Sequence, residues 1–215
     1  MMTTKTMEKQ IRLDWCSHQA AKYACETWHY SKKIPSSKLA KIGVWEDNEF
    51  IGCVIFGVGA GNSTDGRQYG LKKRFEVAEL QRVALKEHTT PTSKIVAIAI
   101  KMVHKAFPKI RLLTSFADTG QGHVGTIYQA TGWVFVGAKI YKDFFEIGGE
   151  RVHTRTVHDR GWRQSEKWLQ EHIDPNTKRL SSYPKNHYLY PLDNKTRTIV
   201  EKLKKGYPKK IADLA

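Results

Sequence analysis

The feature that most constrains the fold is the alternation of strand and helix patterns between residues 75 and 137. The segment FEVAELQRVAL at 75–85 alternates in polarity, as a half-buried strand does. Thr90-Pro91 then opens a helix that is apolar on two faces, with Thr90 as its cap and Pro91 at its first position. A buried strand, a short helix closed by a glycine and a further strand follow, and these lie at 110–118, 122–132 and 133–137.

The segments before and after this stretch predict further elements. Small and apolar residues recur at helical spacing from 14 to 28, with Ser17 as N-cap. Two strands at 39–46 and 49–56 are joined by Asp47-Asn48, which is typical of a hairpin. We expect strands at 139–149 and 150–158 to extend the sheet. The fold class is therefore α/β (α+β), with one mixed sheet, right-handed crossovers and flanking helices.

The charge of the chain indicates a polyanionic partner. Its 215 residues carry 36 Lys and Arg against 21 Asp and Glu, a net charge of +15. Residues 176–215 hold ten of these cations, three acids and four interleaved tyrosines: Tyr183, Tyr188, Tyr190 and Tyr207. We therefore predict a catalytic domain at 1–160 and a basic, aromatic C-terminal extension at 161–215 that packs on it. The simpler alternative is a charged surface without a polyanionic ligand.

Composition excludes several classes of protein. Forty per cent of the residues are hydrophobic, which is enough for a packed core and argues against a disordered chain. No apolar run approaches the length of a membrane span, and the N-terminal segment has no apolar signal core, so we expect an intracellular protein. Three cysteines without a CxxC motif argue against a disulfide framework and a structural zinc site.

One anion site is predicted at the start of the helix that follows residue 90. Thr90, Thr92 and Ser93 place hydroxyl groups and free backbone N–H groups at a helix N-terminus after a strand, which suits the phosphates of a nucleotide-type donor. Capping by Thr90 alone is the structural alternative. The glycines of 57–61 lack the GxGxxG spacing and a following helix, so they predict a loop.

Five further residues carry side chains suited to catalysis. His29 and Tyr30 follow a helix and precede Lys32 and Lys33, an arrangement that suits an acid or base beside a phosphate backbone. A solvent-edge histidine without such a role is the alternative.

Arg82 occupies the middle of a strand, so it must pair with an acid such as Glu79 or Asp118, or face an anionic ligand. Asp118 ends a strand before Gly120-Gln121-Gly122, at the kind of sheet edge where open α/β folds hold their sites. Tyr128 lies on the next helix. A metal site is weakly indicated, by His153 and His158 only.

The combined pattern resembles a known family. ACETWHYSKKIPSSK, KIGVWEDNEFIGCVIFG, YGLKKRFEVAELQRVAL, TPTSKIVAIAI and LLTSFADTGQGHVGTIYQATGW, which span roughly residues 15–137, resemble the Mom family of Mu-like phages, within the GNAT acyltransferase superfamily. The resemblance implies a GNAT-like fold with a mostly antiparallel sheet. It also implies a transferase that converts adenine in double-stranded phage DNA to its N6-methylcarbamoyl derivative and so protects that DNA from host restriction.

The resemblance further implies roles for individual residues. His29, Tyr30, Arg82, Asp118 and Tyr128 match the family's catalytic positions, and Ser93 matches a further polar position of the site. An adenine flipped out of the duplex is the expected substrate, and the host bacterial cytoplasm is the expected location, for a phage- or prophage-encoded protein. The oligomeric state is open. The predicted DNA contacts are Lys32, Lys33, Arg151, Arg155, Lys185, Lys204 and Lys205.

The donor has two candidates. The superfamily implies acetyl-CoA, but residues 86–93 lack the glycines of its usual pyrophosphate turn. Because the product contains a glycinamide-like unit, a glycyl donor such as an aminoacyl-tRNA is the rival. Two other functions remain alternatives: a GNAT-type acyltransferase acting on a protein or small-molecule amine, and a DNA-binding protein without catalysis.

Overall fold

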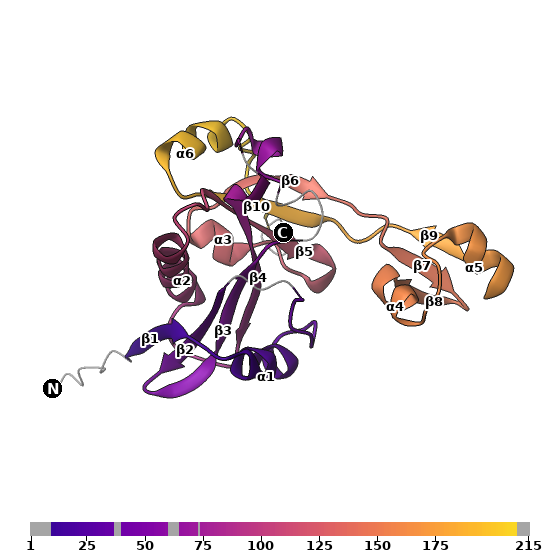
Figure 1. Cartoon of the computed structure of the whole chain (residues 1–215), viewed down its shortest axis with the longest axis horizontal. Coiled ribbons are helices and arrows are strands. Elements are labelled where there is room, and N and C mark those ends of the chain that lie inside the picture. The colour runs from indigo at the N-terminus through magenta and orange to yellow at the C-terminus, as the bar shows by residue number, and fades with distance from the viewer. Residues whose placement is uncertain (1–9, 37–39, 60–64, 73, 210–215) are drawn as a thin grey trace. The chain divides into compact units, whose positions relative to one another are not determined.

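The computed structural model describes residues 10–36, 40–59, 65–72 and 74–209 (Figure 1). The chain forms two compact units. The first comprises Met1–Phe116, Gly125–Val136 and His187–Ala215, and the second comprises Ala117–Val124 and Gly137–Asn186. Among the described residues, no helix is long and apolar enough to cross a membrane.

A seven-stranded sheet forms the centre of the fold, in the order β1-β2-β3-β4-β5-β10-β6. The pairs from β1 to β4 are antiparallel, and β4 and β5 are parallel. This is the mixed, mostly antiparallel sheet with flanking helices that the sequence predicts. The strands are β1 Ile11–Trp15, β2 Ala40–Glu46, β3 Glu49–Gly57, β4 Val77–Leu85, β5 Leu112–Asp118, β6 Val134–Lys139 and β10 Lys185–Pro191.

The helices of the first unit are α1 His18–Trp28, α2 Thr92–Ala106, α3 Thr126–Ala130 and α6 Asn194–Glu201. Helix α1 packs against β3 and β4, where its small residues Ala21, Ala24 and Cys25 form a core cluster with side chains of the two strands. Small side chains let the helix approach the sheet closely. This face of β4 also carries Arg82, because Arg82 pairs in register with Ile55 of that cluster.

The predicted hairpin is confirmed. Asp47 and Asn48 have φ angles of 51° and 67°, the left-handed conformation that a two-residue turn requires at both positions. The predicted helix from residue 14 is wrong in its first turn. Ser17 does cap α1 by accepting a hydrogen bond from the Ala20 amide, but residues 11–15 form β1, paired with β2.

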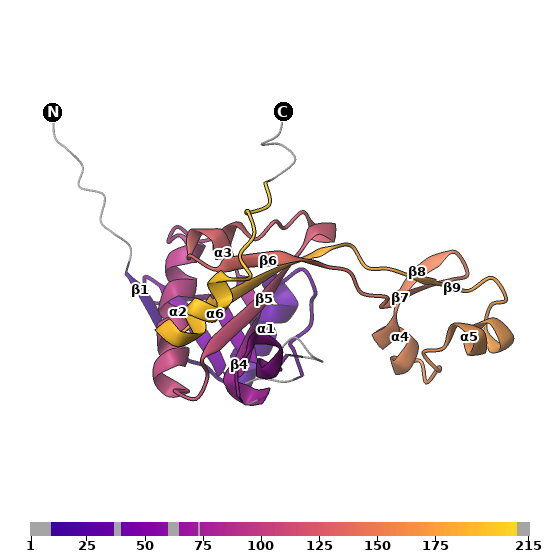
Figure 2. The same ribbon diagram turned by 90° about the horizontal axis from the view of Figure 1, so that it is seen from above.

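The C-terminal segment is built differently from the prediction. Strand β10 lies between β5 and β6 in the central sheet (Figure 2). Its Tyr188 and Leu189 are fully buried. The segment from His187 onward therefore belongs to the first unit, and the compact units do not divide at residue 161. Helix α6 follows β10, is capped by Asp193 and ends at Glu201.

The second unit has its own small sheet, in the order β8-β7-β9. The predicted extension of the main sheet by 139–158 is wrong, because Phe145, Ile147 and Val152 form a separate core with Val157 and Leu169. Residues 154–158 are helical rather than extended. The His153 ring accepts a hydrogen bond from the Arg155 amide and so caps this helix. The elements are β7 Phe144–Ile147, β8 Glu150–His153, β9 Lys178–Leu180, α4 Thr154–Asp159 and α5 Glu166–His172.

Candidate functional site

The site begins where β4 and β5 stop pairing. The register of the two parallel strands runs from Val77 with Leu112 to Glu79 with Thr114. The next residue of β5, Ser115, is buried, and its hydroxyl oxygen lies 2.8 Å from the Leu80 carbonyl oxygen. This hydroxyl therefore bridges the two strands at the point where their backbone pairing ends.

Tyr128 of α3 joins the same point. Its phenol oxygen lies 2.8 Å from the Ser115 hydroxyl, and its ring is 8% exposed. The pKa of Tyr128 is raised to about 12, mainly by burial and also by the nearby Tyr30 and Glu79, while the hydrogen bond to Ser115 acts in the opposite direction. The phenol is consequently neutral at physiological pH, and Tyr30 and Glu79 lie close enough to act on it electrostatically.

His29 and Tyr30 follow directly after α1. The His29 Nδ1 atom accepts a hydrogen bond from the Ser31 amide at 3.1 Å, so a neutral His29 ring carries its proton on Nε2. The two rings lie 4.3 Å apart at an angle of 32°. His29 is buried and Tyr30 is 52% exposed, so the alternative of a solvent-edge histidine is wrong.

Arg82 is a cation without a carboxylate partner among the described residues. Its Nε donates to the Lys33 carbonyl at 3.3 Å and its Nη1 to the Gln81 carbonyl at 2.6 Å. The first bond ties the loop that carries His29 and Tyr30 to β4. The anticipated pairing with Glu79 or Asp118 is not found, and the guanidinium keeps N–H groups suited to an anionic ligand.

A buried thiol lies next to this guanidinium. The pKa of the Cys25 thiol is lowered, first by a hydrogen bond from Cys53 and also by the positive charge of Arg82. Arg82 lies on the face of β4 that packs against α1, since it pairs in register with Ile55 of the same core cluster.

Asp118 belongs to the second unit. Its Oδ1 accepts the Gly120 amide at 3.0 Å, so the carboxylate caps the short turn that follows β5. The first unit thus brings together His29, Tyr30, Arg82 and Tyr128, whereas Asp118 lies in the turn of the second unit.

The predicted anion site at the start of α2 already holds an anion from the chain itself. The carboxylate of Glu46, which is 5% exposed, accepts the Thr89 amide at 3.1 Å, the Thr90 amide at 2.7 Å and the Thr90 hydroxyl at 2.6 Å. These hydrogen bonds, above all that of the Thr90 hydroxyl, lower the pKa of Glu46 to about 2.

The expected cap by Thr90 is therefore wrong, since α2 starts at Thr92 and Pro91 is its N-cap residue. The Thr92 hydroxyl lies 3.0 Å from His88 Nε2. Ser93 is the one residue of the predicted set whose hydroxyl has no hydrogen bond within the described part of the chain. Glu46 thus occupies the amides of Thr89 and Thr90. Phosphate binding by Thr92 and Ser93 stays a prediction.

The predicted DNA contacts are distributed over both units. In the first unit, the Lys32 ammonium donates to the Thr27 carbonyl, Lys33 is exposed and Lys204 lies 3.6 Å from Glu201. In the second unit, Lys185 lies 3.7 Å from Asp143 and Arg155 is exposed. Lys205 and Arg151 are likewise exposed.

No group of three or more potential metal ligands occurs in the described ranges. His153, one of the two histidines considered in the sequence, has Asp143 as a neighbour at 3.7 Å.

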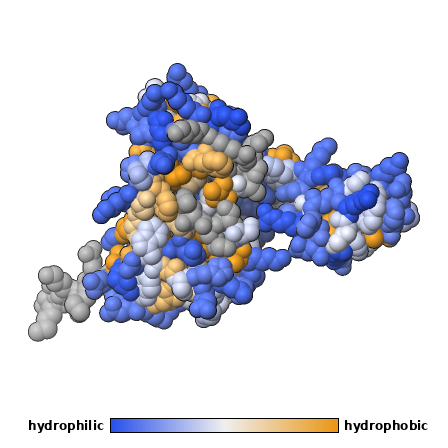
Figure 3. All heavy atoms as spheres, viewed as in Figure 1, coloured by the Kyte–Doolittle hydropathy of each residue, from blue (hydrophilic) through white to orange (hydrophobic). Residues whose placement is uncertain are grey.

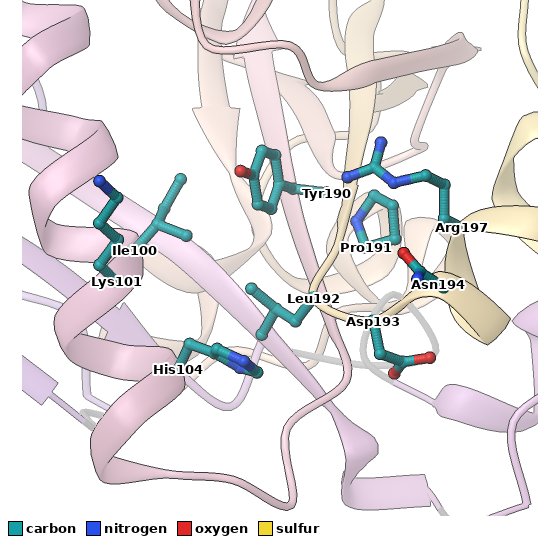
Figure 4. A pocket seen from close by; sticks show the side chains of 9 residues that line it. All are labelled: Ile100, Lys101, His104, Tyr190, Pro191, Leu192, Asp193, Asn194 and Arg197. Atoms are coloured by element: carbon teal, nitrogen blue, oxygen red, sulfur yellow. The ribbon is translucent and has the colours of Figure 1, made fainter.

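A cavity of about 190 Å³ lies elsewhere in the first unit (Figure 4). Side chains of α2 line it on one side, and those of β10 and the start of α6 line it on the other. None of the predicted catalytic, cofactor-binding or DNA-contacting residues lines this cavity.

Three polar residues near the site were missed by sequence analysis: Ser115, Glu46 and His187. His187 is buried, stacks on Phe116 at 4.5 Å and has its Nε2 2.7 Å from the Thr114 hydroxyl. The sequence shows Thr114 and Ser115 as a polar pair in the buried strand 112–118. Their hydrogen-bonding partners, His187, Leu80 and Tyr128, come from other segments of the chain.

Comparison with known proteins gives a family match. The model of the Mom protein family matches residues 10–209. A methylcarbamoylase named Mom from Escherichia phage Mu is 28% identical over 152 residues, which cover 69% of this chain and 62% of the phage Mu protein.

Solved structures share the fold. An acetyltransferase structure from Acinetobacter baylyi has 12% identity and a TM-score of 0.50, covering 87% of this chain and 94% of its own. A Bacillus subtilis acetyltransferase in complex with CoA has 13% identity and a TM-score of 0.48, covering 86% of this chain and all of its own. The likeness to the Acinetobacter baylyi structure shows that this chain shares an acetyltransferase fold.

Proposed function

This chain belongs to the Mom protein family, and from that premise we propose that it transfers a methylcarbamoyl group to the N6 atom of adenine in double-stranded DNA. The observation that carries the proposal is the family match over residues 10–209, which includes every predicted catalytic residue. The net charge of +15 supports a polyanionic substrate.

The first-unit residues support group transfer. Arg82 offers a half-buried cation without a carboxylate partner in the described residues, and it suits an anionic part of the donor or of the intermediate. Tyr128 keeps its proton at neutral pH, so its phenol serves as a hydrogen-bonding group. His29 presents an N–H at Nε2, so in this tautomer it donates a hydrogen bond rather than accepting a proton.

The remaining role is that of the base. Adenine N6 is a weak nucleophile, because its lone pair is delocalised into the ring. When N6 forms its bond to the carbon of the donor, it loses a proton, and the leaving group gains one. Asp118 is our choice for the acceptor of the N6 proton, since a carboxylate accepts without a change of tautomer.

The candidate donors are acetyl-CoA and a glycyl donor such as an aminoacyl-tRNA. Acetyl transfer from acetyl-CoA alone would leave an N6-acetyl group, which lacks the nitrogen of the methylcarbamoyl product. The contact of Glu46 with the Thr89 and Thr90 amides weighs against a pyrophosphate bound at this turn. We assign no step to either donor. The protein acts in the cytoplasm of a bacterial host and shields phage DNA from restriction.

The test is a mass-spectrometric digest of DNA from cells that express the chain or its Asp118→Ala variant. We expect a deoxyadenosine species of the methylcarbamoyl mass with the unchanged chain and none with the variant. An unchanged nucleoside profile from a soluble, folded protein would reject the proposal in favour of a protein or small-molecule amine as acceptor. DNA binding without chemical change would instead favour a non-catalytic DNA-binding protein.

A further inference from the structure

An exposed aromatic side chain stands out in the second unit. Tyr183 lies between β9 and β10, and 61% of it is exposed. An aromatic ring gains stability from burial, so a ring held on the surface is available to a ligand.

The Tyr183 ring is held in place by the turn after β5. A Cβ atom added to Gly120 would lie 2.5 Å from Tyr183 Cδ2, so the ring rests directly on this glycine. The Thr119 amide and hydroxyl both donate to the Pro184 carbonyl, at 3.2 and 2.6 Å. The position of the ring is thus fixed before any ligand arrives, which lowers the entropic cost of stacking.

A cation adjoins the ring. The guanidinium of Arg151 lies 5.3 Å from the centroid of Tyr183 and 4.3 Å from that of Phe144, and its Nη2 donates to the Ser181 carbonyl. These contacts orient Arg151, and it remains exposed to solvent.

The pairing of cation and ring recurs in this unit, with Lys185 at Tyr141 and Arg179 at Phe145. Over the helices and strands of this unit, Figure 3 shows hydrophilic residues interspersed with more apolar ones. Positive charge beside aromatic rings is the chemistry by which proteins hold unpaired nucleotides.

We propose that Tyr183 is a stacking platform for an unpaired adenine of the DNA, with Arg151 contacting a phosphate next to it. The inference rests on the proposed function, since base modification requires an unpaired adenine. The point above Gly120 that touches the Tyr183 ring also lies 3.1 Å from Asp118 Oδ1. Gly120 covers this side of the ring, so the Asp118 carboxylate lies close to the ring of Tyr183 and the adenine stacks on the exposed side. In this proposal Tyr183 is a positioning residue.

Two single strands of equal length test the platform: an oligodeoxyadenylate and an abasic strand with the same number of phosphates. The unchanged protein should bind the adenine strand at least about 5-fold more tightly, because stacking needs a base. Tyr183→Leu should reduce that affinity roughly 5- to 100-fold, as expected for one stacked base, and leave abasic binding unchanged. Tyr183→Phe should behave as the unchanged protein.

The matched control is Tyr23→Leu, which removes a similarly exposed tyrosine, 55% exposed, from α1 of the first unit. It should change neither affinity. Equal binding of both strands by the unchanged protein would overturn the platform even if Tyr183→Leu failed to fold. An equal loss for both strands, or no loss, in a folded Tyr183→Leu protein would also overturn it.

The nucleoside digest separates this inference from the proposed function. If expressing cells contain no modified deoxyadenosine while adenine-strand binding still depends on Tyr183, the reaction is wrong and the platform stands. If the modification occurs and Tyr183→Leu forms it at the unchanged level, the platform is wrong and the reaction stands.

Discussion

The Glu46 carboxylate binds Thr90 twice, through the backbone amide at 2.7 Å and the side-chain hydroxyl at 2.6 Å. Glu46 ends β2, and Thr90 precedes α2, so one buried charge joins the sheet to the start of a helix. Anions favour such positions, because the N–H groups near a helix N-terminus are unpaired. The chain has satisfied these donors internally, which leaves fewer of them for the phosphates of a donor.

Glu46→Gln should lower the free energy of unfolding by about 1–3 kcal/mol at pH 7, since a neutral amide cannot accept all three hydrogen bonds. The pKa of Glu46 is lowered from 4.5 to about 2 on folding, so its stabilisation is present above pH 4.5 and disappears as the pH falls towards 2. Urea unfolding at pH 7 and near pH 2 should therefore show a difference in unfolding free energy between the unchanged chain and Glu46→Gln that is smaller at the acidic pH.

Glu49→Gln is the control for this prediction, because Glu49 is an exposed acid on the neighbouring strand, paired with Lys86. We expect its effect to stay below about 1 kcal/mol. A difference between the unchanged chain and Glu46→Gln that is equal at both pH values would contradict the assigned role.

Tyr128→Phe should reduce DNA modification by about 100-fold or more while changing stability by no more than about 1.5 kcal/mol. The variant keeps the buried ring and removes only the phenol hydroxyl. Ser115→Ala is the matched change, because it removes the same hydrogen bond and keeps the phenol. Nucleoside digests should show a large loss of modified deoxyadenosine for Tyr128→Phe only. Equal losses in the two variants would assign the effect to the hydrogen bond between Ser115 and Tyr128.

The pKa of Tyr128 is itself measurable. Because burial raises it to about 12, the Tyr128 phenol should ionise later than an ordinary tyrosine as the pH rises. Tyrosinate absorbance should show a late-titrating group in the unchanged protein that is missing in Tyr128→Phe, while the raised pKa of Tyr188 affects both proteins alike. An identical titration above pH 10 in both proteins would contradict this result.

Arg82→Ala should abolish modification and leave DNA binding nearly intact, since the residue faces α1 rather than an exposed surface. Arg82→Lys should recover little, because an ammonium cannot reproduce the two directed bonds of the guanidinium. Arg67→Ala is the control: its side chain is 68% exposed and paired with Asp65, and neither readout should change. Combined loss of binding and modification in Arg82→Ala would indicate misfolding instead of a local role.

The sequence predicted local structure well where each segment carries its own signal. The hairpin at Asp47-Asn48 follows from the turn preference of these two residues, and the Ser17 cap follows from the hydroxyl before α1. The sequence analysis missed β1, a five-residue edge strand, although its residues Ile11–Trp15 alternate between apolar and polar as a strand does. Strand β10 was also missed, because its place between β5 and β6 is set by contacts far apart in sequence.

The candidate site shows the same division. A charged residue inside a strand predicted that Arg82 pairs with an acid or faces an anionic ligand. Its side chain is half-buried and its hydrogen bonds within the described residues go to backbone carbonyls, so the acid pairing is wrong and the anionic ligand stays a prediction. The occupation of the Thr90 turn by Glu46 could not be predicted, since the two residues are 44 positions apart and nothing local marks the acid as buried. Pairings of this kind depend on the packed sheet.

Lys204 and Lys205 test whether the chain end of the first unit contacts DNA. Lys204→Gln/Lys205→Gln should weaken duplex binding and reduce the slope of log affinity against log salt by about one for each phosphate that the variant no longer neutralises. Both side chains are exposed, and Lys204 has only Glu201 at 3.6 Å as a charged neighbour within the described residues, so folding should be unaffected.

Lys167→Gln provides the matched control, with an exposed lysine near Glu171 in the second unit and outside the predicted DNA-binding set. Binding titrations over a range of salt concentrations should give it the unchanged slope. An unaltered slope for the double variant would place the DNA on other cations, whereas a reduced slope with normal modification per bound protein would separate binding from chemistry. Because counterion release depends on the number of phosphates neutralised, the slope reports DNA binding by these lysines independently of catalysis.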